Sequence, residues 1–118
     1  MRAKLKRLHS PDIPDLENWY PGEGPFGFLL QAMVGPASSD GEESFDMIVC
    51  TPEWFAERMR GQLVMSGIHT LFISNYDYGA PKRFIERSVE RSEAEDWSKL
   101  ADRLSWLGHW EFADYRHA

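Results

Sequence analysis

The chain has 118 residues, of which 42% are hydrophobic and 14% aromatic, and its formal net charge is −6. This length and this apolar fraction predict one folded domain over residues 1–118 and exclude a disordered chain. The single cysteine excludes an internal disulfide, and no apolar run is long enough for a membrane span or a secretory leader, so we expect a cytoplasmic protein.

Charge is distributed unevenly along the chain. Residues 1–8 hold four basic side chains and no acid, whereas residues 9–57 hold ten acids and no Lys or Arg. If those acids share a face, their field repels nucleic acid and attracts a basic partner. The alternative is that they are ordinary solvated surface charges.

The first half of the chain predicts three strands and one long loop. Residues 3–9 alternate well enough for a strand at a sheet edge, where lysines discourage aggregation. Residues 10–25 contain four prolines and two glycines, which predict an irregular loop of a length that is often functional. Residues 26–34 and 44–50 carry apolar side chains at period two, which predicts an antiparallel hairpin around a polar turn at 35–43.

The second half predicts a helix, a strand, two helices and a short strand. Thr51 is expected to cap a helix that ends at Gly61. The apolar run within 68–75 predicts a strand buried on both faces. A second helix is expected from Pro81 to about residue 91. Its inward residues should be the following: Phe84, Ile85 and Val89.

A capping box predicts the start of the third helix. Ser92 followed by Glu95 has the spacing of that motif, and Gly108 should end the helix. Residues 109–112 then predict a terminal strand. The order of elements predicts an α+β fold with a mainly antiparallel sheet of four to five strands. About three helices should pack on one face of this sheet, and the strand order stays open.

The sequence lacks the common signatures of catalysis and of cofactor binding. It has no P-loop, no dinucleotide-binding glycine motif, no C-x-x-C and no H-E-x-x-H. Apolar neighbours should make Cys50 inert as a nucleophile. One cluster near the end of the chain could suggest a metal, but its spacing is not specific: His109, Glu111, Asp114 and His117. We therefore predict no enzyme activity, no cofactor and no metal.

Five short segments resemble the immunity protein 8 family, and together they run through nearly the whole chain. They are LHSPD at 8–12, FGFLLQA at 26–32, ESFD at 43–46, CTPEW at 50–54 and GHWEF at 108–112. The resemblance implies a bacterial protein that is encoded beside a polymorphic toxin and protects the producing cell from it. It implies no catalytic residue and no cofactor, and it brings no established binding residues.

The residues and the resemblance together lead to one binding hypothesis. An immunity protein must bind quickly and tightly, and complementary charge raises association rates. We expect the loop 10–25 and the turn 35–43 to present acids to a basic, nuclease-type toxin, with two aromatic residues as hot spots. The expected binding residues are these: Asp12, Asp15, Glu17, Trp19, Tyr20, Glu23, Asp40, Glu42 and Glu43.

Two other functions remain open at this point. One is a generic interaction module or self-associating subunit that uses exposed aromatic residues. The other is a small enzyme with an unrecognised site. No nucleic-acid or membrane partner is expected, because the sequence pI is about 5.1 and no apolar span is present.

Overall fold

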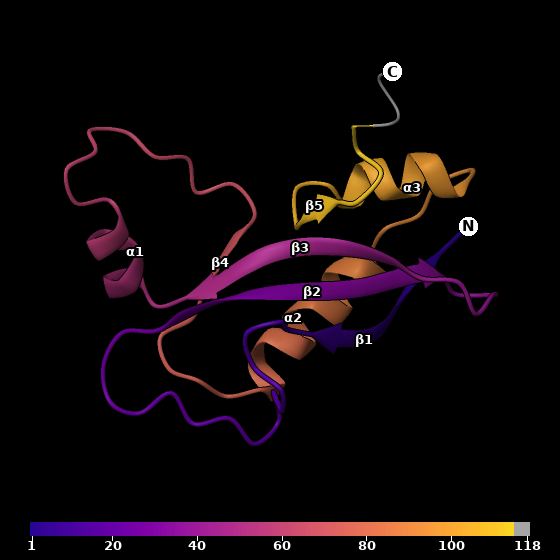
Figure 1. Cartoon of the computed structure of the whole chain (residues 1–118). Helices are drawn as coiled ribbons and strands as arrows, with labels where there is room; N and C mark the ends of the chain where they lie inside the picture. Colours follow the sequence, from indigo (N-terminus) through magenta and orange to yellow (C-terminus); the bar gives the residue numbers. More distant parts are fainter. Residues whose placement is uncertain (115–118) are drawn as a thin grey trace.

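A computed structural model describes residues 1–114 and shows an α+β fold (Figure 1). The prediction of this class is confirmed. In chain order the elements are β1 (Ala3–His9), β2 (Gly27–Pro36), β3 (Glu43–Cys50), α1 (Pro52–Arg58), β4 (Thr70–Phe72), α2 (Gly79–Glu90), α3 (Trp97–Leu104) and β5 (His109–Trp110).

The strands form one mixed sheet in the order β1-β2-β3-β4, with β5 also paired to β3. The predicted hairpin of β2 and β3 is confirmed, and its register runs from Gly27 opposite Cys50 to Val34 opposite Glu43. The β1 strand lies at the expected edge, antiparallel to β2, with a bulge between Leu5 and Arg7. The β4 strand is parallel to β3, and β5 is antiparallel to it.

One hydrophobic core lies on a single face of the sheet. Alternate residues of β2 and β3 are buried there, as the period-two pattern predicts. The α2 and α3 helices add their buried residues to the same cluster, so both cover this face. The core side chains that these four elements contribute include Leu30, Val34, Phe45, Met47, Ile85, Val89, Leu100 and Leu104.

The α1 helix begins as the sequence predicts but lies beyond the end of β3 instead of on the core face (Figure 1). Its N-cap Thr51 accepts a hydrogen bond from the backbone N–H of Trp54, and Gly61 follows it with a φ of 81°. No residue of α1 is buried. The Trp54 ring covers Gly27, where an added Cβ would lie 2.4 Å from the indole.

Two expectations about buried residues are wrong. The expected strand 68–75 has only three paired residues, and Phe72 is 50% exposed. The reason is that β4 is the last strand of the sheet path, with only β3 beside it. Phe84 is 45% exposed because the buried stripe of α2 is formed by Pro81, Ile85 and Val89, which are spaced four residues apart.

The predicted capping box at Ser92 is also wrong. Helix α3 begins at Trp97, and its N-cap is Asp96, which accepts a hydrogen bond from the backbone N–H of Lys99. The preceding residues instead pair with the N-terminus, through a bridge between Arg2 and Glu93. This pairing holds the segment extended, so the helix cannot start there.

Candidate functional site

The end of the sheet beyond β3 and β4 brings together three segments that are distant in sequence. Because β3 and β4 are parallel, their carboxyl ends meet at the same end of the sheet, where Thr51 follows β3 and Ser74 lies two residues after β4. The antiparallel β2 begins at this end of the sheet, so the last residues of the loop 10–26 lie there as well. Figure 1 shows this loop and α1 at one end of the sheet, and the β2–β3 turn at the other.

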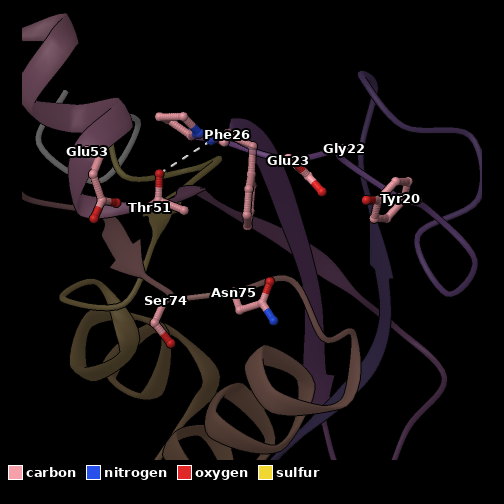
Figure 2. A pocket seen from close by; sticks show the side chains of 10 residues that line it. Tyr20, Gly22, Glu23, Phe26, Thr51, Glu53, Ser74 and Asn75 are labelled. Atoms are coloured by element: carbon pink, nitrogen blue, oxygen red, sulfur yellow. Dashed lines mark hydrogen bonds between the residues drawn. The ribbon is translucent and has the colours of Figure 1, made fainter.

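An open cleft of about 480 Å³ lies between these segments (Figure 2). One wall is the loop that carries Tyr20 and Glu23, and the other is the start of α1 with Glu53. The residues that line it are Tyr20, Gly22, Glu23, Gly24, Pro25, Phe26, Thr51, Glu53, Ser74 and Asn75. The cleft therefore has two carboxylates and no basic side chain in its lining.

Hydrogen bonds to the Thr51 hydroxyl hold the loop in place around this cleft. The buried Thr51 hydroxyl accepts hydrogen bonds from the N–H groups of Phe26 and Trp54, each at 3.3 Å, and so ties the end of the loop to the start of α1. Gly22 and Gly24 have φ values of 79° and 108°, which side-chain-bearing residues rarely adopt. Glycine at these two positions therefore allows the backbone conformation that forms this wall of the cleft.

Four acids at this end of the molecule have no basic partner within the described residues. No ion pair involves Asp15, Glu17, Glu23 or Glu53. All four are exposed to solvent. Glu23 and Glu53 line the cleft, where their charges favour the approach of a cationic group. Asp15 and Glu17 line a separate pocket on the same loop, and Glu17 also borders a pocket whose lining includes Lys4, Lys6, Arg7 and Lys82.

The two aromatic residues that the sequence suggested as hot spots have different environments. Trp19 is half-buried and packs edge-on against Phe26, Phe28 and Tyr76, with ring centroids 4.9–5.7 Å apart. Tyr20 is 76% exposed and borders the cleft. Trp19 thus anchors the loop, whereas the Tyr20 ring is exposed to solvent beside the cleft.

Burial perturbs the tyrosine beneath the loop. Tyr76 donates a hydrogen bond from its hydroxyl to the backbone carbonyl of Leu16. Burial first, and then the nearby acidic groups Tyr78, Asp15 and Asp77, raises the pKa of Tyr76 to about 12. The hydroxyl therefore stays protonated, and the loop stays bonded to it, throughout the physiological range.

The acids of the β2–β3 turn lie at the opposite end of β2 and differ in their contacts. Asp40 is exposed, and Glu42 pairs with Arg7 at 2.8 Å. Glu43 accepts hydrogen bonds from the indole N–H groups of Trp97 at 2.7 Å and Trp110 at 2.8 Å. The structure therefore does not join this turn to the loop 10–26, and Glu43 has an internal role.

Asp12 also has an internal contact. Its Oδ2 accepts a hydrogen bond from the backbone N–H of Leu29 at 3.0 Å, just beyond the last β1–β2 pair, His9 with Gln31. The exposed Asp15 accepts one from the Asn18 amide at 2.9 Å. Asp12 therefore fastens the loop to β2, while Asp15 bonds only within the loop.

Sequence reasoning missed Glu53, Ser74 and Asn75 as parts of the site. Glu53 is one of the ten acids of residues 9–57 but lies in the expected helix, outside the expected binding loop, and residues 74 and 75 fall at the end of the expected strand 68–75. The missing signal was the parallel pairing of β3 and β4, which the sequence does not reveal. That pairing alone brings residues 51–53 next to residues 74–75.

The described residues offer no arrangement for metal chemistry or for a reactive thiol. Residues 1–114 contain no group of three or more His, Cys, Asp or Glu side chains that could hold a metal ion. In the suspected cluster, Glu111 instead accepts a hydrogen bond from the backbone N–H of Ser44 at 2.7 Å, and His117 lies outside the described residues. Burial raises the pKa of Cys50, which disfavours its thiolate, although Arg58 opposes this shift.

The fold and the site define a small α+β protein with an acidic, open cleft suited to contact with another molecule. The immunity protein 8 family model matches residues 3–115 of this chain, and the chain belongs to that family. Comparisons with curated proteins and with solved structures find no significant match. Membership supports an immunity role against a toxin. No helix within residues 1–114 has the length and apolarity to cross a membrane.

Proposed function

We propose that this protein neutralises a cognate toxin by binding it through the acidic end of the sheet, without catalysis. The partner is a basic, nuclease-type toxin whose cationic substrate-binding surface faces the loop 10–26 and the cleft. Neutralisation takes place in the cytoplasm of the producing cell. The residues that make the contact are Asp15, Glu17, Tyr20, Glu23 and Glu53.

One observation carries this proposal: a member of an immunity family has an open cleft lined by two carboxylates and no basic side chain, beside a loop that holds two further exposed acids without an ion pair within residues 1–114. A nuclease must attract phosphate, so its active surface is positively charged. An acidic protein can cover that surface and compete with the nucleic acid for it. Charge complementarity also speeds the encounter, which favours neutralisation before damage.

The test uses the toxin that is encoded beside this protein's gene. A triple reversal, Asp15→Lys, Glu17→Lys and Glu23→Lys, changes the net charge by +6 at the proposed surface. We expect the association rate to fall by about tenfold or more at low salt, and protection of toxin-expressing cells to be lost. The measurement is binding kinetics at several salt concentrations, together with a co-expression rescue assay.

A matched control has the same charge change at sites away from the cleft. Glu90→Lys, Glu95→Lys and Asp114→Lys replace three exposed acids outside the loop. This control should retain most of its association rate and protect cells. Equal losses in both triple variants would mean that net charge alone matters, and unchanged binding in the first variant would reject the proposed surface. A neighbouring toxin that the wild-type protein neither binds nor suppresses would reject the function itself.

A further inference from the structure

The outer edge of β4 is open. The N–H of Ile48 donates to the carbonyl of His69, and the N–H of Ile73 donates to the carbonyl of Cys50, each at 2.9 Å. In a parallel pair these bonds use alternate residues, so the backbone N–H and C=O groups of Thr70 and Phe72 point away from β3. Since β4 ends the sheet path, these groups face the side on which another strand could add.

The two edges of the sheet differ in how they are protected. The β1 edge has a bulge and the basic side chains Lys4, Lys6 and Arg7, which are common devices against strand addition. The sequence of β4 and its next residue, Thr70 to Ile73, has no charge and no proline. Of these two edges, the β4 edge is the one that is chemically suited to accept another strand.

An apolar groove of about 210 Å³ runs beside this open edge, between β4 and the start of α2. Phe72 and Phe84, which are 50% and 45% exposed, border it. The lining contains no charged residue: Leu71, Phe72, Ile73, Ala80, Pro81 and Phe84. The groove is large enough for one apolar side chain of a chain that pairs with β4.

The groove and the acidic cleft are consecutive along β4 and the residues that follow it. Ile73 lines the groove, while Ser74 and Asn75 line the cleft. An extended chain advances about 3.3 Å per residue, so a segment along β4 reaches the cleft roughly three residues past Phe72. A segment that carries Lys or Arg two or three positions from an apolar residue would fit both features.

We propose, on the basis of the proposed function, that an extended segment of the toxin adds to the free edge of β4. It places an apolar side chain in the groove beside Phe84 and a basic side chain near Glu23 and Glu53. Backbone hydrogen bonds to Phe72 give the segment its register, and the groove gives it specificity.

Charge favours the toxin over a second copy of this chain as the occupant. A second copy has the same net charge of −6, and its basic segment, residues 4–7, is already held in the β1–β2 pairing with a bulge between Leu5 and Arg7. A segment from a basic toxin satisfies the carboxylates of the cleft at the same time as it fills the groove. The apolar contact would thus form the centre of an interface with a charged rim.

Side-chain variants test the groove with the purified neighbouring toxin as the probe. Phe84→Asp should raise the dissociation constant by about tenfold or more, because it places a charge in the apolar contact. Trp106→Asp is the matched control, since Trp106 is 57% exposed and lies outside the groove. It should change the dissociation constant by less than about threefold. Equal affinity of Phe84→Asp and the wild type would overturn the proposal.

A backbone test separates strand addition from simple apolar contact. Phe72→Pro removes an N–H that points away from β3, whereas Phe72→Ala removes the ring and keeps the N–H. Proline is tolerated at such edge positions, and circular dichroism confirms the fold of both variants. The proline variant should bind several-fold more weakly than the alanine variant. Equal binding of the two would exclude strand addition.

Hydrogen exchange on the wild-type protein gives a readout without substitution. The Phe72 amide should become protected when the toxin binds, while β1 amides that point away from β2 should not change. Unchanged exchange at Phe72 would overturn the proposal, as would a dimer of the free protein that Phe84→Asp converts to a monomer. If Phe84→Asp binds normally while the Asp15, Glu17 and Glu23 reversal does not, the proposed function stands and this inference fails.

Discussion

Glu43 at the start of β3 accepts a hydrogen bond from the indole N–H of Trp110 on β5, 67 residues later, at 2.8 Å. The same Oε1 atom also accepts the indole N–H of Trp97, at the start of α3, at 2.7 Å. Trp110 in turn stacks on the buried Phe45, with ring centroids 6.5 Å apart. One carboxylate therefore joins the C-terminal strand and α3 to the central sheet.

Removing this carboxylate should destabilise the fold. Glu43→Ala leaves two indole N–H groups without their acceptor, and we expect a loss of about 2–4 kcal/mol in the free energy of unfolding. Glu43→Gln keeps an acceptor and should lose about 1 kcal/mol. Glu42→Ala, which removes only a surface ion pair with Arg7, should lose less than about 1 kcal/mol. Urea denaturation measures all three, and equal losses at Glu42 and Glu43 would contradict the assigned role.

The Tyr76 hydroxyl should make stability depend on pH in the alkaline range. Its pKa is raised from 10.0 to about 12, so the folded state keeps this proton to higher pH than the unfolded chain. The contribution of the hydroxyl is therefore complete below pH 10 and is lost as the pH rises toward 12. Tyr76→Phe should cost about 0.5–1.5 kcal/mol at pH 8, and this difference should shrink above pH 10.

Thermal unfolding of wild type and Tyr76→Phe at pH 8 to 12 checks this expectation. Tyr20→Phe is the control, because Tyr20 is 76% exposed and should give the same melting temperature as the wild type across the range. A constant difference between wild type and Tyr76→Phe up to pH 12 would show that the hydroxyl is not coupled to folding.

Gly35 should tolerate no side chain. A Cβ at this position would lie 1.8 Å from the backbone carbonyl oxygen of Gly41, so the β2–β3 turn would have to move. Gly35→Ala should cost about 2–4 kcal/mol in the free energy of unfolding. An added Cβ at Gly67 meets nothing within 4 Å, so Gly67→Ala should stay within about 0.5 kcal/mol of the wild type. Chemical denaturation separates the two variants, and similar losses would argue against this turn geometry.

Asp12 should contribute to stability more than to binding. Asp12→Ala removes the acceptor of the Leu29 N–H, and we expect a loss of about 1 kcal/mol in the free energy of unfolding. Asp15→Ala should lose less than about 0.5 kcal/mol, because its bond to Asn18 is exposed. The rate of toxin association should instead fall more in Asp15→Ala than in Asp12→Ala, since Asp15 faces solvent. The same order in both measurements would contradict this division of roles.

The sequence by itself determined the features that depend on local pattern. Period-two apolar residues predicted β2 and β3 in their hairpin, and Thr51 predicted the start of α1. The prolines and glycines of residues 10–25 predicted the irregular loop, and the five matching segments predicted the family. The predictions of the hairpin, the start of α1 and the loop succeeded because the contacts that decide them lie within a few residues or within one hairpin.

Tertiary structure alone decided which of the candidate acids lie close together. Glu23 and Glu53 line one cleft, and Asp15 and Glu17 line a separate pocket on the same loop, whereas Glu43 is engaged by two tryptophans at the other end of the sheet. The parallel pairing of β3 and β4 built the cleft, and pairing with the N-terminus kept residues 93 and 94 out of α3. Such long-range pairings depend on the packing of the whole sheet, and no local periodicity encodes them.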